Sequence, residues 1–515
     1  MLVKTFCAEV MGLEATTITI EVNMTRGVMF HLSGLADTAV KESYDRIRAA
    51  ISNIGLKPPT AELTINLSPA DIRKEGSGYD LPLAIGILAA HGKVSDSMLS
   101  DYMMIGELGL DGNLKPVSGI LPVAIRARKE KFKGLFVPRE NAREAAVVND
   151  LDVYAMDNLT DVISFLNGSH LYEPTIVDTR KEFYEQQYSF DLDFADVKGQ
   201  ESVKRALEIA AAGGHNIIMI GSPGSGKSMM AKRLPSILPP LSLAESLETT
   251  QIHSVAGKLS NGTSLISQRP FRSPHHTVSQ VAMTGGGNRA LPGEVSMAHN
   301  GVLFLDELPE FNKTTLEVLR QPLEDRKITI SRAKYTVEYP CSFMFVASMN
   351  PCPCGYYGDP THHCVCTPGQ ISRYLSKISG PLLDRIDLHC EVAVVPFAQL
   401  SQMQPGEPSA VIRERVIKAR QIQEKRYKDF KGIYCNAQMT ERMIHQFAEP
   451  DTASLDMLRL AMERLSLSAR AYSRILKVAR TIADLEGSAE IQSHHIAEAI
   501  GYRSLDRGDW AERSQ

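Results

Sequence analysis

The sequence lacks a long hydrophobic run. Its longest apolar stretch, residues 81–90, is much shorter than the ~20 residues that a helix needs to cross a bilayer. The first residues also lack the apolar segment of a secretory signal. We therefore expect no membrane segment and a cytoplasmic protein.

Charge of one sign is not in excess either. The chain has 56 Lys and Arg and 60 Asp and Glu, which gives a net charge of -4. Nucleic acid would then have to bind at a local basic patch rather than through the charge of the whole chain. Internal repeats and low-complexity tracts are absent, and 515 residues suffice for roughly three packed domains.

Cysteine is scarce, which argues against a fold held by disulfides. Only 8 cysteines occur in 515 residues, and four of them lie within residues 352–366. In a cytosolic chain, such a local group indicates metal binding rather than oxidation. The other four are expected to be buried thiols.

Hydrophobic periodicity divides the chain into four segments and predicts an α/β fold. Residues 1–170 alternate strand-like and helix-like runs, as in an α+β domain, and residues 171–193 are polar and aperiodic, as in a linker. Residues 194–400 open with a helix, an apolar strand and a glycine-rich turn, which start a parallel nucleotide-binding sheet. Residues 401–515 are expected to form an all-helical lid. In the first segment, the strand-like runs are 17–22, 28–32 and 61–67, and the helix-like runs are 38–54 and 81–91.

The glycine-rich turn fits the phosphate-binding pattern GxxxxGK(S/T). Its glycines let backbone N–H groups curl around phosphates, and the following helix N-terminus adds positive potential. Lys227 is expected to reach the β- and γ-phosphates and Ser228 to ligate Mg²⁺, so we predict ATP and Mg²⁺ as cofactors. The motif consists of Gly221, Ser222, Pro223, Gly224, Ser225, Gly226, Lys227 and Ser228.

Two carboxylates follow a second apolar strand at residues 301–305. Charged groups at the end of a buried run need a chemical reason, and phosphate chemistry provides one. We expect Asp306 to hold the Mg²⁺ and Glu307 to polarise the attacking water. The alternative is an acidic helix cap after a core strand. With the phosphate-binding turn, the pair predicts an ATPase.

A third strand, residues 342–349, ends at Asn350. A neutral amide at this point can act as a donor near the γ-phosphate or the attacking water. The position resembles sensor 1 of AAA+ motors.

Arginines are expected to complete the catalytic set. Arg385 lies between Asp384 and Asp387, where its guanidinium could stabilise the transition state in a neighbouring subunit. The alternative is a local ion pair with either acid. On one helix of the lid, Arg470 is assigned the sensor-2 role, reaching the nucleotide from above, with Arg474 as second choice. A solvated basic helix face is the alternative there.

Two Cys-x-Cys pairs begin just after Asn350. Residues i and i+2 of an extended chain face the same way, so each pair can present two thiolates to a tetrahedral Zn²⁺. His362 or His363 could replace one cysteine, and unliganded thiols or a disulfide remain alternatives. A metal here would stiffen the junction between the nucleotide and a subunit interface. The pairs are Cys352 with Cys354 and Cys364 with Cys366.

A basic hairpin is predicted at residues 326–339. In a ring, Arg332 and Lys334 could contact DNA phosphates without regard to sequence, and Tyr335 could stack on a base. An exposed polar turn without a partner is the alternative. A second basic stretch, residues 126–133, is interpreted as a solvated helix face.

Three segments together resemble the magnesium-chelatase branch of AAA+ proteins: residues 271–277, 292–307 and 380–387. The layout of residues 1–505 is similar to the ComM/YifB family. This resemblance implies a homo-hexameric ring that hydrolyses ATP at its subunit interfaces. It further implies branch migration of DNA, as a helicase, in homologous recombination and natural transformation, with recombination proteins as further partners. A chelatase-type ATPase that assists metal insertion into a porphyrin is the alternative.

The N-terminal segment resembles the catalytic domain of Lon protease, which has a fold like domain 2 of ribosomal protein S5. Gly78 and Leu121 stand where the protease has its serine and lysine, so no acyl-enzyme chemistry is expected. A shifted dyad of Ser77 and Lys74 is the alternative. The similar domain of the recombination protein RadA implies a ring-forming or DNA-contacting scaffold instead.

Overall fold

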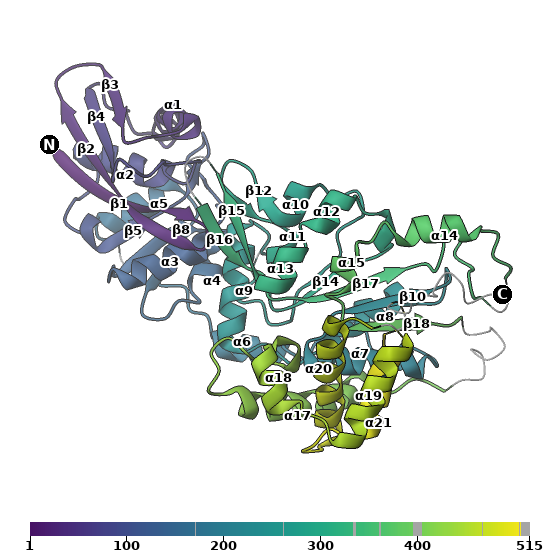
Figure 1. Ribbon diagram of the computed structural model, residues 1–515. Coiled ribbons are helices and arrows are strands. Elements are labelled where there is room, and N and C mark those ends of the chain that lie inside the picture. The colour runs from purple at the N-terminus through teal and green to yellow at the C-terminus, as the bar shows by residue number, and fades with distance from the viewer. Residues whose placement is uncertain are drawn as a thin grey trace.

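The computed structural model describes residues 1–169, 171–260, 262–332, 336–359, 362–394, 404–465, 467–503 and 505. In Figure 1 the chain runs from an N-terminal α+β domain through a central sheet to a group of helices packed beside that sheet. Within the described ranges, no helix combines the length and the apolar character that crossing a bilayer requires.

A seven-stranded sheet forms the N-terminal domain, in the order β3-β4-β2-β1-β5-β8-β9. Strands β1 and β2 pair antiparallel, whereas β5, β8 and β9 run parallel. Side chains of β4 alternate between buried and more exposed, as in a strand with one face on the core. The strands are β1 (Leu2–Met11), β2 (Glu14–Thr25), β3 (Phe30–Ser33), β4 (Glu62–Ser68), β5 (Tyr102–Met104), β8 (Gly134–Pro138) and β9 (Asp152–Met156).

Helix α2 is the centre of this domain's core. All of its residues are buried, and it contacts both β1 and β2. The longest apolar run of the sequence is therefore a core helix. The helices of the domain are α1 (Thr38–Asn53), α2 (Asp80–Ala90), α3 (Ile120–Lys129), α4 (Arg139–Ala145) and α5 (Leu159–Leu166), and a separate short hairpin comprises β6 (Glu107–Leu108) and β7 (Leu114–Lys115).

The segment expected to be an aperiodic linker contains helix α6 (Thr179–Gln186). Phe183 is buried, and Glu182 accepts hydrogen bonds from Arg143 at 2.6 Å and from Ser264 at 2.8 Å. Arg143 belongs to the N-terminal domain and Ser264 to the central module. Tertiary contacts, rather than amphipathic periodicity, therefore hold this helix.

The central sheet is entirely parallel, in the order β11-β14-β17-β10-β18. Residues of β14 and β17 are all buried, because helices cover both faces of such a sheet. The strands are β10 (Ile217–Gly221), β11 (Phe271–Arg272), β14 (Val302–Leu305), β17 (Met344–Met349) and β18 (Leu388–Val392). The helices are α7 (Glu201–Gly213), α8 (Lys227–Arg233), α9 (Leu243–Val255), α10 (Gln280–Thr284), α11 (Glu294–Met297), α12 (Lys313–Glu317), α13 (Arg320–Asp325), α14 (Pro368–Leu375) and α15 (Gly380–Leu383).

The N-terminal domain packs on the central module through α3 and α9. The N–H of Gly119 donates to the Ser254 carbonyl at 3.0 Å. The buried Glu144 carboxylate accepts hydrogen bonds from the Ser254 hydroxyl and, at 3.0 Å, from the Leu121 N–H. Burial raises the pKa of Glu144, and these hydrogen bonds oppose that rise. The interface thus contains a satisfied polar network.

Two hairpins lie where the central module meets the N-terminal domain (Figure 1). One comprises β12 (Gly285–Gly286) and β13 (Leu291–Pro292), and the other β15 (Lys327–Ser331) and β16 (Thr336–Pro340). The second is the hairpin predicted from the sequence. A Cβ placed on Gly12, in the turn between β1 and β2, would lie 2.6 Å from Val337 Cγ1 of β16. The turn and the hairpin are therefore in close contact.

The C-terminal residues form helices that pack on the central module through α7. His215, at the end of α7, contacts Asp387 at 3.1 Å through Nδ1 and Thr481 Oγ1 at 2.8 Å through Nε2. The helices are α17 (Ser409–Tyr427), α18 (Glu441–Phe447), α19 (Thr452–Leu465), α20 (Ala469–Glu486) and α21 (Ser493–Gly501).

Candidate active site

The carboxyl ends of β10, β14 and β17 meet at one edge of the central sheet. These strands are neighbours in the order β14-β17-β10. They lead into the phosphate-binding loop, Asp306 and Asn350, respectively. Motifs more than a hundred residues apart in sequence are thereby brought to the edge where ligands of parallel sheets bind.

The phosphate-binding loop has the backbone that its glycines permit. Gly224 has φ 79° and Gly226 φ 90°, in the left-handed region that favours glycine. Lys227 begins α8 and donates to the carbonyls of Gly221 at 2.7 Å and Ser222 at 3.0 Å. Burial lowers the pKa of the Lys227 ammonium, and the carboxylates of Asp306 and Glu307 oppose this.

The groups expected to hold Mg²⁺ are adjacent. Ser228 Oγ donates to Asp306 Oδ2 at 2.5 Å, and the Ser348 hydroxyl donates to the other carboxylate oxygen. A hydroxyl and a carboxylate at this spacing are hard oxygen donors of the kind that Mg²⁺ takes beside phosphates. These residues fit the ion that the sequence predicted.

Glu307 is held differently from its neighbour. Its φ of 54° turns the chain sharply after β14, and its side chain is 58% exposed. The short 3₁₀ turn that follows receives no cap from the Glu307 side chain, so the helix-cap alternative is wrong for this residue. The carboxylate is directed to the open edge of the site.

Asn350 lies beside the loop lysine. Its Oδ1 accepts a hydrogen bond from Lys227 Nζ at 3.3 Å. Asn350 therefore lies in the same site as the phosphate-binding loop and the two carboxylates, as predicted.

His276 belongs to this site, although the sequence analysis assigned it no role. Its Nδ1 is 3.7 Å from Glu307 Oε2, and its ring lies edge-on to Phe311. The segment follows β11, which pairs with β14, so its end must lie near Glu307. The adjacent His275 and His276 after a strand were the available signal.

Arg385 lies in a surface cleft of about 550 Å³, which α10, α12, α13 and β15 line. Its guanidinium pairs with Glu324 and donates to the Pro381 carbonyl at 2.7 Å. The alternative, a local ion pair, is wrong only in its partners: Asp384 and Asp387 bond to other arginines, and Arg385 forms its ion pair with Glu324. Among the described residues, Nε of Arg385 has no hydrogen-bond partner.

Arg470 and Arg474 reach the two acids that flank Arg385. Arg470, 68% exposed, donates to Asp384 at 2.8 Å, and Arg474 donates to the buried Asp387 at 2.7 Å. The Arg474 guanidinium, with His215, holds the pKa of Asp387 well below its usual range against the effect of burial. Arg474 is therefore an anchor of α20, and Arg470 contacts Asp384, the residue that precedes Arg385. The sensor-2 role assigned to Arg470 stays a prediction.

The predicted basic hairpin is only partly described. Arg332 is exposed, and its Nε donates to the Gly287 carbonyl at 3.3 Å. Lys334 and Tyr335 lie outside the described residues.

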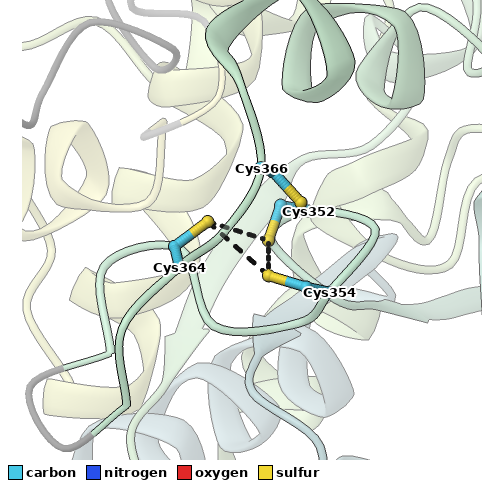
Figure 2. Close-up of side chains that lie close together, drawn as sticks. All are labelled: Cys352, Cys354, Cys364 and Cys366. Carbon is cyan, nitrogen blue, oxygen red and sulfur yellow. Dashed lines mark hydrogen bonds between the residues drawn. The ribbon is translucent and has the colours of Figure 1, made fainter.

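The four clustered cysteines come together in the loop after β17 (Figure 2). The sulfur of Cys352 is 3.3 Å from that of Cys354 and 3.7 Å from that of Cys364, and Cys354 and Cys364 are 3.6 Å apart. All four sulfurs, including that of Cys366, lie within 4.8 Å of one another. His362 points elsewhere: its ring stacks on Tyr356.

The positions of the N-terminal domain that correspond to the protease dyad do not form a serine–lysine pair. Leu121 is fully buried, and Gly78 packs near Ile105. Ser77 donates to the Glu107 carboxylate, and the Lys74 ammonium donates to the Pro69 carbonyl. The hydroxyl and the amine of the shifted alternative are thus directed to different partners.

Comparison with known proteins identifies the family. Three models match: "Magnesium chelatase, subunit ChlI" over residues 193–400, "Subunit ChlI of Mg-chelatase" over 20–141, and "Magnesium chelatase, subunit ChlI C-terminal" over 406–503. Competence protein ComM of Haemophilus influenzae is 44% identical over 499 residues, which cover 96% of each chain. The chain belongs to the ComM/YifB family. The predicted family is thereby confirmed.

More distant matches agree with the two-part architecture. The magnesium-chelatase 38 kDa subunit of Rhodobacter capsulatus is 22% identical over 59% of this chain and 84% of its own. Lon protease 2 of Bacillus subtilis is 31% identical over 160 residues, 28% of this chain and 27% of its own. ComM/YifB proteins therefore combine a Lon-like α+β domain with a magnesium-chelatase-like AAA+ module, whose phosphate-binding loop supports binding of ATP with Mg²⁺.

Proposed function

We propose that this ComM/YifB protein is an ATP-driven DNA motor, a homo-hexameric ring that promotes branch migration in homologous recombination and natural transformation. The 44% identical relative is named a competence protein, which supports a role with incoming DNA. The nucleotide site supports ATP hydrolysis as the source of work.

The observation that carries the proposal is the separation of the catalytic groups into two places. Lys227, Asp306, Glu307 and Asn350 gather at the edge of the sheet. Arg385 instead lies in the cleft of α12 and α13, and Arg470 bonds to Asp384, which precedes Arg385 in the chain. A site that needs a guanidinium at the γ-phosphate is then completed by a second subunit, as in a ring.

Hydrolysis follows from the first group of residues. Lys227 neutralises charge on the β- and γ-phosphates, and Asn350 positions the oxygen that lies nearest to it. Ser228 and Asp306 would hold Mg²⁺, which supplies charge neutralisation to the phosphates when bound. Glu307 accepts a proton from the attacking water, and His276 fixes the direction of its carboxylate.

The second group acts on the neighbouring subunit. Glu324 and Asp384 each hold one arginine in the isolated chain. A γ-phosphate presented by the next subunit competes with these carboxylates, since it carries more charge and offers a bidentate partner. Assembly around ATP thereby releases Arg385 and Arg470 to the transition state.

We assign DNA binding to the hairpin of β15 and β16. Arg332 is exposed near its tip, and Lys334 and Tyr335 complete the basic turn in the sequence. Contacts to phosphates and base stacking are independent of sequence, as branch migration through any sequence requires.

The test measures ATP turnover with and without branched DNA, together with strand exchange on a three-way junction. Branched DNA should stimulate turnover, and junction processing should require Glu307. If neither stimulation nor junction processing occurs, the proposal fails.

A chelatase-type ATPase is the second candidate, because the matching family models bear the name of magnesium chelatase. Its discriminating assay is ATP-dependent insertion of Mg²⁺ into a porphyrin in the presence of the other chelatase subunits. Metal insertion without any response to DNA would favour this candidate.

A further inference from the structure

The sulfur cluster of Figure 2 has the dimensions of a metal site. Tetrahedral Zn²⁺ with bonds of about 2.3 Å places its sulfurs ~3.8 Å apart. The three sulfur–sulfur distances given for Cys352, Cys354 and Cys364 are 3.3, 3.6 and 3.7 Å. A disulfide would require about 2.0 Å, and every cysteine of the chain is a free thiol.

The loop backbone is arranged to support sulfur ligands. The N–H groups of Tyr356 and Val365 are directed to the sulfur of Cys354, and the N–H of Cys366 to that of Cys364. Such hydrogen bonds orient thiolates in metal sites. A second group of possible metal ligands, Glu486, His494 and His495, is not arranged in this way. His495 Nδ1 accepts a hydrogen bond from the Gln492 N–H at 2.9 Å, as part of a helix cap. Its Nε2 therefore carries a hydrogen and donates it to Glu486.

The cysteine loop also contacts the phosphate-binding loop. A Cβ on Gly355 would lie 2.6 Å from Pro223 Cδ, which places the two backbones in direct contact. Asp359 Oδ2 accepts a hydrogen bond from Ser222 Oγ at 2.7 Å. Asn350, just before the first cysteine, contacts Lys227. Three contacts therefore connect the cysteine loop to the loop that receives the phosphates.

We propose that Cys352, Cys354, Cys364 and Cys366 bind one Zn²⁺ and that this ion holds the loop as a clamp on the phosphate-binding loop. The thiols release their protons to solvent on binding, and four thiolates with one Zn²⁺ form the closed coordination of a structural site. The ion fixes residues 352–359 against Pro223 and Ser222, which keeps the backbone N–H groups of residues 221–228 in the geometry that phosphate requires.

The proposed clamp presupposes that the phosphate-binding loop binds nucleotide, and it does not depend on the DNA substrate. Its test uses the full-length protein without DNA. Zinc per chain is measured by elemental mass spectrometry, and affinity for a fluorescent ATP analogue by titration. The variants are Cys364→Ser/Cys366→Ser, whose side chains are only half-buried, and Asp359→Asn, which weakens the contact to Ser222 without removing a sulfur.

We expect one zinc per chain in the wild type, in Asp359→Asn and in the control Cys7→Ala, whose thiol lies in β1. The double cysteine variant should lose zinc and bind the nucleotide about tenfold more weakly, and Asp359→Asn about fivefold more weakly. Lys227→Ala should keep its zinc and lose nucleotide binding, which separates the clamp from the loop itself.

Two results would overturn the proposal. One is a wild-type protein that takes up no zinc when it is supplied during purification. The other is a zinc-free double variant with wild-type nucleotide affinity. Because no DNA is present, a failure of branch migration would appear in the junction assay and leave these measurements unaffected.

Discussion

The nucleotide site and the pocket of the N-terminal domain both contain several charged groups, but only the first directs them outward. In the nucleotide site, Lys227 faces Asp306 and Glu307, and the Glu307 side chain is 58% exposed. Opposite charges stand around an open edge of the sheet. Arg385 and Arg470 lie apart from this group and pair with Glu324 and Asp384.

The second pocket, a cavity of about 250 Å³, is lined mainly by the N-terminal domain, with Val255, Arg289 and Leu291 from the central module, and its acids are paired within the chain. Glu9 is bonded by the Tyr79 hydroxyl and Glu107 by the Ser77 hydroxyl. The contrast teaches that similar residue types make a reactive site only where their partners are a ligand or another subunit. Substitutions at five positions test this difference.

Arg385→Ala should lower ATP turnover about 10³-fold while nucleotide binding stays close to normal, because in the proposed ring the guanidinium would serve the neighbouring site and lies apart from the phosphate-binding loop of its own subunit. Turnover and nucleotide titration measure the two quantities. Mixed rings of Arg385→Ala and Glu307→Gln subunits should recover part of the activity, since some interfaces then contain both groups. Mixtures as inactive as either variant alone would show that the arginine acts within its own subunit.

Glu307→Gln should lower turnover about 10²-fold with unchanged nucleotide affinity, since the amide keeps the shape but accepts no proton. Single-turnover hydrolysis is the measurement. Glu310→Gln, a nearby acid outside the set, is the matched control. Near-normal turnover in Glu307→Gln would remove this carboxylate from its role.

His276→Ala should lower the turnover number about tenfold and leave KM unchanged, because the ring near Glu307 orients the carboxylate rather than binding the substrate. Steady-state kinetics separate the two parameters. His275→Ala is the control, since that ring bonds to Thr277. A change in KM alone would assign His276 to nucleotide binding.

Glu9→Gln tests the N-terminal pocket through pH. Burial raises the pKa of Glu9 from 4.5 to about 7, and hydrogen bonds from Tyr79 and the Glu75 N–H, with the charge of Arg289, oppose it. The folded state therefore holds this proton more tightly than the unfolded chain does. The resulting stabilisation is complete below pH 4.5 and lost as the pH rises through about 7.

The amide cannot ionise, so Glu9→Gln should flatten this pH dependence and stabilise the domain above pH 7 by about 3 kcal/mol. Hydrogen exchange in β1 is the measurement, with the exposed Glu14→Gln as control. An unchanged pH profile would mean that Glu9 is ionised in the fold and that the pocket is more like the nucleotide site than its contacts indicate.

Ser77→Ala should have the smallest effect. Its hydroxyl bonds to Glu107, remote from the nucleotide site, and the Lys74 amine bonds to the Pro69 carbonyl instead, so ATP turnover should stay within about twofold of wild type. A peptidase assay is the second readout. A wild-type peptidase activity that this substitution abolishes would break the comparison outright.

The local hydrophobic pattern predicted the helices and strands whose position is set by neighbouring residues. The apolar run at 81–91 is α2, residues 38–54 correspond to α1, and the strand expected at 342–349 is β17. The phosphate-binding loop needed only its glycines and flanking elements. The run at 28–32 is displaced from β3, Phe30–Ser33, because only four residues pair with β4.

Features that depend on packing between distant segments could not be predicted from the sequence. Helix α6 exists through Phe183 and the bonds of Glu182, neither of which leaves a periodic pattern. The placement of Arg470 follows from how α20 docks, which Arg474 and Asp387 decide across the interface. His276 joins the site only because β11 pairs beside β14.

The close fit of Gly12 against Val337 has a mechanical consequence. The hairpin of β15 and β16 cannot move toward β1 without pushing the turn between β1 and β2, since no gap is left to absorb the displacement. Those two strands are the longest in the N-terminal sheet. Through this contact, a displacement of the hairpin would be passed on to the N-terminal domain.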